Sequence, residues 1–147
     1  MNSVIGYYTT QFGELWEKSL FDLVEEAIVG VLKEGSLAKE EIDVVFFGNM
    51  LAGTLENNLH SPSKIAEILK MNIPIFRVEA ACASGGVAFN LAKTYLEANS
   101  NKNVLVIGAE KMKAEETGSN KETSRCPYFD QPMYCKGLTP DGKPMCD

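Results

Sequence analysis

Cys82 is the residue whose surroundings in this sequence most clearly suggest chemistry. It lies in the segment Val78–Gly86, VEAACASGG, between a strand-like apolar run and a helix-like stretch. The small residues on both sides would let a substrate approach the sulfur closely. A helix beginning just after Cys82 would direct unpaired N–H groups and a positive dipole end toward it, which favours the nucleophilic thiolate. The alternative is a small buried cysteine packed at a tight turn.

Strand-like and helix-like stretches alternate on both sides of that cysteine. Apolar residues recur at helical spacing between Leu20 and Leu32, Ser19 and Asp22 form a capping pattern, and Gly35 provides a stop. The pattern predicts a helix whose apolar stripe belongs to the core.

The remaining elements predict an α/β fold. We expect strands at Ser3–Tyr8, Val44–Gly48, Ile73–Val78 and Val104–Gly108, a loop at Asn49–His60, and helices from Ser61 (as N-cap, before Pro62) and over Gly85–Ala98. The run Val44–Gly48 is continuously apolar, which is typical of a strand covered on both faces. Alternating strands and helices predict a mostly parallel sheet with right-handed crossovers.

Composition limits the functional classes. The 147 residues suit one ordinary domain, with 45% hydrophobic and 23% charged residues. The net charge of −6 argues against a nucleic-acid binder and against an electrostatic membrane anchor. Neither an apolar run that could span a bilayer nor a signal peptide is evident. We therefore expect the four cysteines to be reduced thiols and the compartment to be the cytoplasm.

Several motifs occur in an order typical of one family. Besides VEAACASGG, the chain carries TQFGELW at Thr10–Trp16, IDVVFFGN at Ile42–Asn49 and VLVIGAEKM at Val104–Met112. From about Val4 to Met112 the sequence resembles the N-terminal half of a thiolase, in particular the archaeal and sterol-carrier-type acetyl-CoA acetyltransferases. The ketoacyl synthases, which are related condensing enzymes, have a similar cysteine setting, but the stretch after Val104 looks more like a thiolase.

The resemblance implies a fold and its boundaries. The expected fold is a partial thiolase-like αβα layered arrangement, one half of the duplicated family fold. In the family this half carries a five-stranded mixed sheet, of which four strands are evident here. Residues 1–112 would form the half-domain, and residues 113–147 an irregular tail containing Pro, Gly and Cys, because the likeness stops there.

The resemblance also implies a reaction. Cys82 would attack the thioester of an acyl-CoA and keep the acyl group, and a second acyl-CoA would then accept it in a Claisen condensation. Ser84, Gly85 and Gly86 are the expected substrate-binding residues, the glycines by allowing close approach of the backbone. No cofactor is expected, since the coenzyme A thioester is the substrate, and no metal.

The chain departs from the family in its catalytic partners. Family members take catalytic histidines and a second cysteine from the second half, whereas the single His60 matches none of these and is interpreted as a loop residue. One oxyanion donor is typically worth ~100–1000-fold in rate, so we expect this chain alone to be slow or inactive. An exposed apolar helix face would favour a homo-oligomer or a complementary thiolase half as partner. The alternative is a non-catalytic remnant or interaction module that retains the half-fold.

Other polar residues support weaker hypotheses. Cys126, Cys135 and Cys146 have eight and ten residues between them, a spacing unlike paired zinc ligands, so incidental thiols are the preferred interpretation over zinc. Glu79 and Glu110 are interpreted as salt-bridged or solvated scaffold residues. Of the remainder, Asn57, Asn58 and His60 would shape a pocket loop, and Lys111 and Lys113 would form a solvated face or meet a CoA phosphate.

Overall fold

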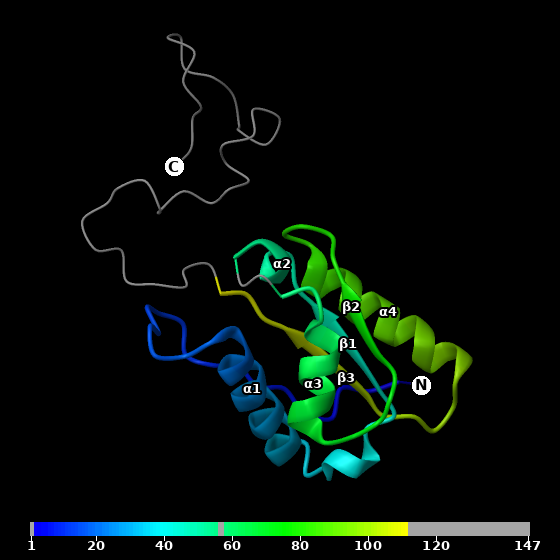
Figure 1. The fold of residues 1–147 in the computed structure, drawn as a ribbon. Coiled ribbons are helices and arrows are strands. Elements are labelled where there is room, and N and C mark those ends of the chain that lie inside the picture. The colour runs from blue at the N-terminus through cyan, green and yellow to red at the C-terminus, as the bar shows by residue number, and fades with distance from the viewer. Residues whose placement is uncertain (1, 56–57, 112–147) are drawn as a thin grey trace, which may run out of the picture. The chain divides into compact units, whose positions relative to one another are not determined.

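The computed structural model describes residues 2–55 and 58–111, all of which belong to the first of two units, 1–114 and 115–147. The elements in chain order are α1 (Leu20–Glu34), a 3₁₀ turn (Lys39–Glu41), β1 (Val44–Gly48), α2 (Ala52–Leu55), α3 (Ser61–Leu69), β2 (Ile75–Val78), α4 (Ser84–Ala98) and β3 (Val104–Gly108) (Figure 1).

The strands form a parallel sheet in the order β2-β1-β3. Gly48 at the end of β1 pairs with Val78 of β2 and with Gly108 of β3. The carboxyl ends of the strands therefore lie at one edge, the upper edge in Figure 1, where α2 and the start of α4 also lie. The segment carrying Cys82 leaves β2 at this edge.

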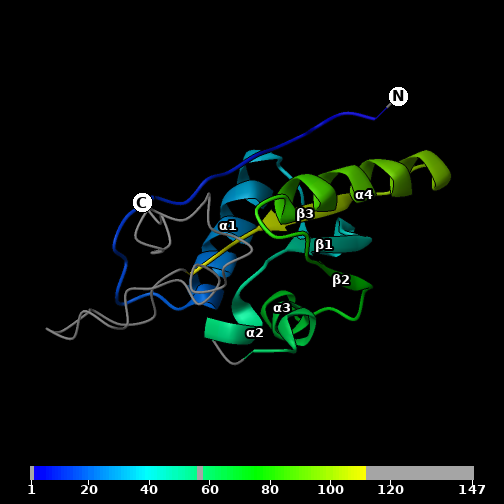
Figure 2. The ribbon, with the colours of Figure 1, turned by 90° about the horizontal axis from the view of Figure 1, so that it is seen from above.

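Helices cover both faces of the sheet. Val45 and Phe47 of β1 belong to a core cluster with residues of α1 and α3, whereas Val44 and Phe46 belong to a second cluster with α4. Figure 2 shows α3 and α4 on opposite sides of the strands. All five residues of β1 are buried, so the prediction of a strand covered on both faces is confirmed.

The start of α1 also agrees with the sequence pattern. The Ser19 side chain accepts a hydrogen bond from the Asp22 N–H, and the Asp22 carboxylate accepts one from the Ser19 N–H at 2.7 Å. This is a capping box, which satisfies two N–H groups that a helix start leaves unpaired. Gly35 is the C-cap, as expected.

The strand predicted at Ser3–Tyr8 is wrong. The described residues contain three strands, not four, and Ser3–Tyr8 lies outside the sheet. A Cβ atom built on Gly30 would overlap the Tyr8 ring, and one on Gly6 would lie 2.8 Å from Gly35 N. The segment therefore packs along α1 and does not pair with a strand. Gly6 in the segment and Gly30 in the helix allow the close contact.

The predicted loop at Asn49–His60 contains the short helix α2. Its start is held by Asn49, whose Oδ1 accepts a hydrogen bond from the Ala52 N–H at 3.0 Å. The cap of α3 lies one residue earlier than predicted, because His60 is the N-cap and Ser61 is the first helical residue. Ser61 is fully buried, so it packs in the interior and does not cap.

Candidate active site

Cys82 lies in a tight turn between β2 and α4, and its side chain is an exposed free thiol. Two hydrogen bonds close the turn, from the Ala83 N–H to the Ala80 carbonyl at 3.0 Å and from the Ser84 N–H to the Ala81 carbonyl at 3.1 Å. The exposure contradicts the alternative of a buried packing cysteine.

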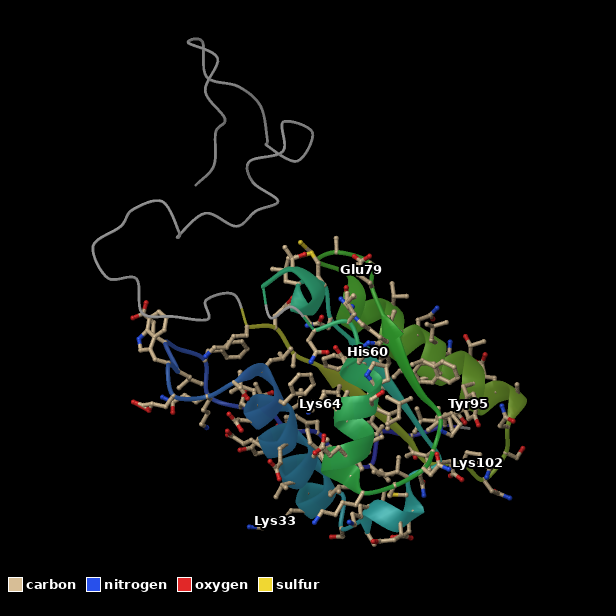
Figure 3. The ribbon with its side chains drawn as sticks, viewed as in Figure 1. Lys33, His60, Lys64, Glu79, Tyr95 and Lys102 are labelled. Atoms are coloured by element: carbon tan, nitrogen blue, oxygen red, sulfur yellow. The ribbon has the colours of Figure 1, made fainter. Side chains whose placement is uncertain are left out.

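Ala81 has a left-handed backbone conformation, with φ at 48°. This conformation is strained for any residue with a Cβ atom. The Ala81 N–H donates to Glu79 Oε1 at 2.8 Å, so Glu79 stabilises the turn as a scaffold residue and makes no ion pair among the described residues. Figure 3 shows Glu79 at the carboxyl edge of the sheet. Strained residues often accompany functional sites because surrounding contacts hold them in place.

Ser84 is buried beneath the turn. Its hydroxyl accepts a hydrogen bond from the Ala80 N–H at 2.9 Å and donates one to the Ala81 carbonyl at 2.6 Å. Both hydroxyl contacts are therefore within the turn, and the side chain holds the Cys82 segment against the start of α4.

Gly85 and Gly86 form the exposed first turn of α4. No hydrogen bond from the N–H of either residue is found within residues 2–55 and 58–111. A Cβ atom on either glycine would meet no atom within 4 Å. The close approach expected of these glycines occurs at Gly48, where a Cβ atom would lie 2.8 Å from the Ser84 carbonyl oxygen. The end of β1 is thus in direct contact with the start of α4.

His60 is the N-cap of α3, and Lys64 lies in the first turn of that helix (Figure 3). Asn58, His60 and Lys64 line a surface pocket of about 370 Å³, together with Leu59, Ser63 and Glu67. His60 is exposed, as the sequence predicted for a loop histidine. Asn57, which was expected to shape the same loop, lies outside the described residues.

Glu110 contacts the backbone after β1. Its carboxylate accepts hydrogen bonds from the N–H groups of Met50 at 3.0 Å and Leu51 at 3.1 Å, and from the Asn49 side chain. Asn49 was not singled out from the sequence, although a polar residue directly after a buried strand at the sheet edge is the signal that would have identified it.

Lys111 Nζ donates to the carbonyls of Leu15, at 2.6 Å, and Lys18. It therefore joins the end of β3 to the segment before α1. Lys113 and the three cysteines Cys126, Cys135 and Cys146 lie outside the described residues. Among the described residues no group of three His, Cys, Asp or Glu side chains could hold a metal ion. None of the helices found there has the length and apolar character needed to cross a membrane.

The sequence matches known proteins over most of its length. The family model "Thiolase, N-terminal domain" matches residues 3–142. An acetyl-CoA acetyltransferase of Methanocaldococcus jannaschii is 43% identical over 111 residues, covering 75% of this chain and 28% of that protein. The acetyl-CoA acetyltransferase of Methanothermobacter thermautotrophicus is 38% identical over 111 residues, covering 75% of this chain and 29% of that protein.

Condensing enzymes match less closely. A β-ketoacyl-[acyl-carrier-protein] synthase III of Psychromonas ingrahamii is 32% identical over 103 residues, covering 67% of this chain and 31% of that protein. The crystal structure of 3-oxoacyl-[acyl-carrier-protein] synthase III from Aquifex aeolicus superposes with a TM-score of 0.57 at 25% identity, over 68% of this chain and 33% of that one. The chain thus spans less than a third of the length of these curated relatives.

Proposed function

The chain belongs to the thiolase N-terminal domain family, and from this premise we propose that Cys82 is the nucleophile of a thiolase-type acyltransferase. The observation that carries the proposal is the exposed Cys82 thiol at a strained turn leading into α4. The acetyl-CoA acetyltransferases among its relatives support an acyl-CoA as substrate.

In the first step the Cys82 thiolate attacks the carbonyl carbon of the acyl-CoA thioester. A bond forms between Cys82 sulfur and the acyl carbon, the bond to the coenzyme A sulfur breaks, and coenzyme A leaves as a thiolate that takes a proton. The acyl group remains on Cys82 as a new thioester. In the second step a base from outside this chain takes the α-proton of another acyl-CoA, and the resulting carbanion attacks the thioester on Cys82. A C–C bond forms, the bond between the acyl carbon and the Cys82 sulfur breaks, and Cys82 leaves as a thiolate.

The first turn of α4 supplies donors for this chemistry. The N–H groups of Gly85 and Gly86 have no partner in the part of the chain that the structure describes, and such groups stabilise anions at a helix start. We assign to these two glycines the substrate contacts predicted from the sequence, made through the main chain. Ser84 serves the same step by holding the turn. The coenzyme A thioester is the substrate, and no further cofactor takes part.

The complete reaction requires groups from outside this chain. In α4 the small residues Ser84, Ala88 and Ala92 are buried, whereas Val87, Phe89 and Leu91 are 37%, 55% and 40% exposed. A helix that turns large apolar residues outward is expected to be covered by another layer. We propose that a complementary thiolase half, or a second copy of the chain, packs on this face. The free thiol favours a reducing compartment, and the cytoplasm is our proposal.

Acylation of Cys82 is the step that tests the proposal. The full chain is incubated with acetyl-CoA and its intact mass is measured over time, for the wild type, for Cys82→Ala, and for a variant with Cys126, Cys135 and Cys146 all replaced by serine. We expect a slow gain of one acetyl group in the wild type and in the triple variant, and none in Cys82→Ala. If wild type and Cys82→Ala behave alike, Cys82 is not the nucleophile, and the alternative of a non-catalytic remnant or interaction module holds.

The exposed face of α4 is tested by sedimentation. Leu91→Glu places a charge beside Val87 on one side of α4, and Lys93→Glu places a charge at an exposed polar position on the opposite side of the same helix. We expect any self-association of the wild type to be lost in Leu91→Glu and kept in Lys93→Glu. A wild type that is monomeric at all concentrations excludes the second copy and leaves the complementary half as the partner.

A further inference from the structure

The backbone just after β1 is held by charged residues from both neighbouring strands. On the β3 side, Glu110 accepts hydrogen bonds from the N–H groups of Met50 and Leu51 and from the Asn49 amide. Asn49 is 1% exposed, and its side chain also donates to the Ala109 carbonyl at 2.9 Å. Hydrogen bonds to an ionised group are about twice as strong as neutral ones, so this contact fixes the segment firmly.

Arg77 holds the same segment from the β2 side. Its Nη2 donates to the carbonyl of Met50 at 3.1 Å and to that of Asn49 at 3.5 Å. Arg77 Nε is buried and has no hydrogen-bond partner among the described residues, and the guanidinium makes no ion pair there. Arg77 as a whole is only half-buried, but a buried Nε–H without a partner still carries a cost.

The two charges therefore share one target. The carboxylate of Glu110 accepts hydrogen bonds from the Asn49 side chain and from the main-chain N–H groups of Met50 and Leu51. The guanidinium of Arg77 donates to the carbonyls of Asn49 and Met50. The strand register explains the arrangement, because Arg77 is paired with Phe47, and Gly48 is paired with Gly108, two residues before Glu110. We call this pair of contacts the β1 clamp.

The β1 clamp is connected to the Cys82 turn through direct contacts. The Asn49 N–H donates to the Val78 carbonyl at 3.1 Å, at the point where β2 leads into the turn. Gly48 lies so close to α4 that a Cβ atom there would be 2.9 Å from Gly85 N and 2.8 Å from the Ser84 carbonyl oxygen. A shift of the end of β1 would therefore move the first turn of α4 and the turn that Ser84 holds.

We propose that Glu110 and Arg77 are positioning residues for Cys82, acting through Gly48 and Asn49 on the start of α4. The proposal deepens the proposed function and rests on it, since it concerns the orientation of the proposed nucleophile. Neither residue touches the reacting atoms. Small displacements of a reacting group reduce rates strongly, about 100-fold for 1 Å in some enzymes.

The test compares Glu110→Gln with a matched control at the other end of the same strands. Asp43 also accepts a backbone hydrogen bond next to β3, from the Asn103 N–H at 2.8 Å, but at the amino edge of the sheet. The full chain is used for the wild type, Glu110→Gln and Asp43→Asn, and the rate of Cys82 acetylation is measured as a function of acetyl-CoA concentration. Thermal unfolding identifies a temperature at which all three are folded.

We expect Glu110→Gln to lower the limiting rate of acetylation about tenfold and to leave the half-saturating concentration within about twofold, because orientation is lost and not substrate binding. Asp43→Asn should leave both values unchanged. An equal fall in both variants, no fall in Glu110→Gln, or a change confined to the half-saturating concentration would overturn the proposal.

Two further measurements keep the test independent of folding and of acyl transfer. If Glu110→Gln does not fold, Arg77→Lys replaces it, because lysine keeps the charge but loses the fork of donors. If the wild type is not acetylated, the proposed function fails, and the same variants are compared by the rate of Cys82 alkylation with iodoacetamide. A tenfold change in Glu110→Gln alone would then still support positioning of Cys82, and equal rates would exclude it.

Discussion

Gly48, the last residue of β1, contacts Gly85 in the first turn of α4. A methyl group on Gly48 would lie 2.9 Å from the Gly85 Cα atom, whereas a methyl group on Gly85 would meet nothing within 4 Å. The close approach of strand and helix therefore depends on the missing side chain of Gly48. The backbone of the Cys82 turn is built on this contact, because Ser84, which holds the turn, precedes Gly85 directly.

Replacement of Gly48 by alanine should force the strand and the helix apart. We expect Gly48→Ala to lower the free energy of unfolding by about 1–3 kcal/mol, as overpacking does in well-packed interiors. Gly85→Ala is the matched control and should be neutral or stabilising by up to about 1 kcal/mol, since alanine is the better helix former. Urea unfolding measures both. Equal losses of unfolding free energy in Gly48→Ala and Gly85→Ala would contradict a close contact that depends on Gly48.

The left-handed backbone at Ala81 should make glycine the better residue there. A residue with a Cβ atom loses about 1–2 kcal/mol in this conformation, and glycine loses about 0.4–1 kcal/mol through the entropy of the unfolded chain. We therefore expect Ala81→Gly to raise the free energy of unfolding by about 0.5–1 kcal/mol. Ala66, inside α3, is the control, and Ala66→Gly should be destabilising by about 1 kcal/mol because glycine is the poorer helix former. A loss of stability in both variants would mean that Ala81 is not strained.

The parts of the fold that depend on residues close together in the sequence could be predicted from the sequence alone. The capping box of Ser19 and Asp22, the stop at Gly35 and the buried run of β1 are all local patterns, and the structure contains each of them. The position of Cys82 between a strand and a helix is local too. The strand expected at Ser3–Tyr8 failed because strand formation depends on a distant partner, and α1 provides the contacts of that segment instead.

The contacts that support the site could not be predicted in the same way. Glu110 lies 61 positions from Asn49 in the chain, and only the register of β1 with β3 brings them together. Arg77 reaches the same segment through the register of β1 with β2. A single sequence does not contain these registers, so it indicates only a scaffold role for Glu110 and gives no signal for Arg77.

Loss of the Ser84 hydroxyl should destabilise the turn. Ser84→Ala removes its hydrogen bonds with the Ala80 N–H and the Ala81 carbonyl, in a residue that is 5% exposed. Leaving a partly buried N–H without a partner costs about 1–3 kcal/mol, and we expect a loss in that range by urea unfolding. The control is Thr94→Ala, which removes an exposed hydroxyl bonded to the Asn90 carbonyl in the same helix. That variant should change stability by less than about 0.5 kcal/mol. A similar loss of unfolding free energy in Ser84→Ala and Thr94→Ala would show that the Ser84 hydroxyl does not stabilise the turn.

Asp43 should contribute to stability at neutral pH and lose that contribution in acid. The hydrogen bond from Lys102, and then that from the Asn103 N–H, hold the pKa of Asp43 below its ordinary value of 3.8. Because the unfolded chain binds the proton more readily, this stabilisation is present above about pH 4 and is lost as the pH falls through the lower folded pKa. Asp43→Asn should therefore lower the urea midpoint at pH 6 and reduce its fall between pH 6 and pH 3. Glu67→Gln is the control, because the pair of Glu67 with Lys64 is exposed on both sides and should contribute little. If Asp43→Asn keeps the full acid-induced fall of the wild type, Asp43 does not stabilise the amino edge of the sheet in this way.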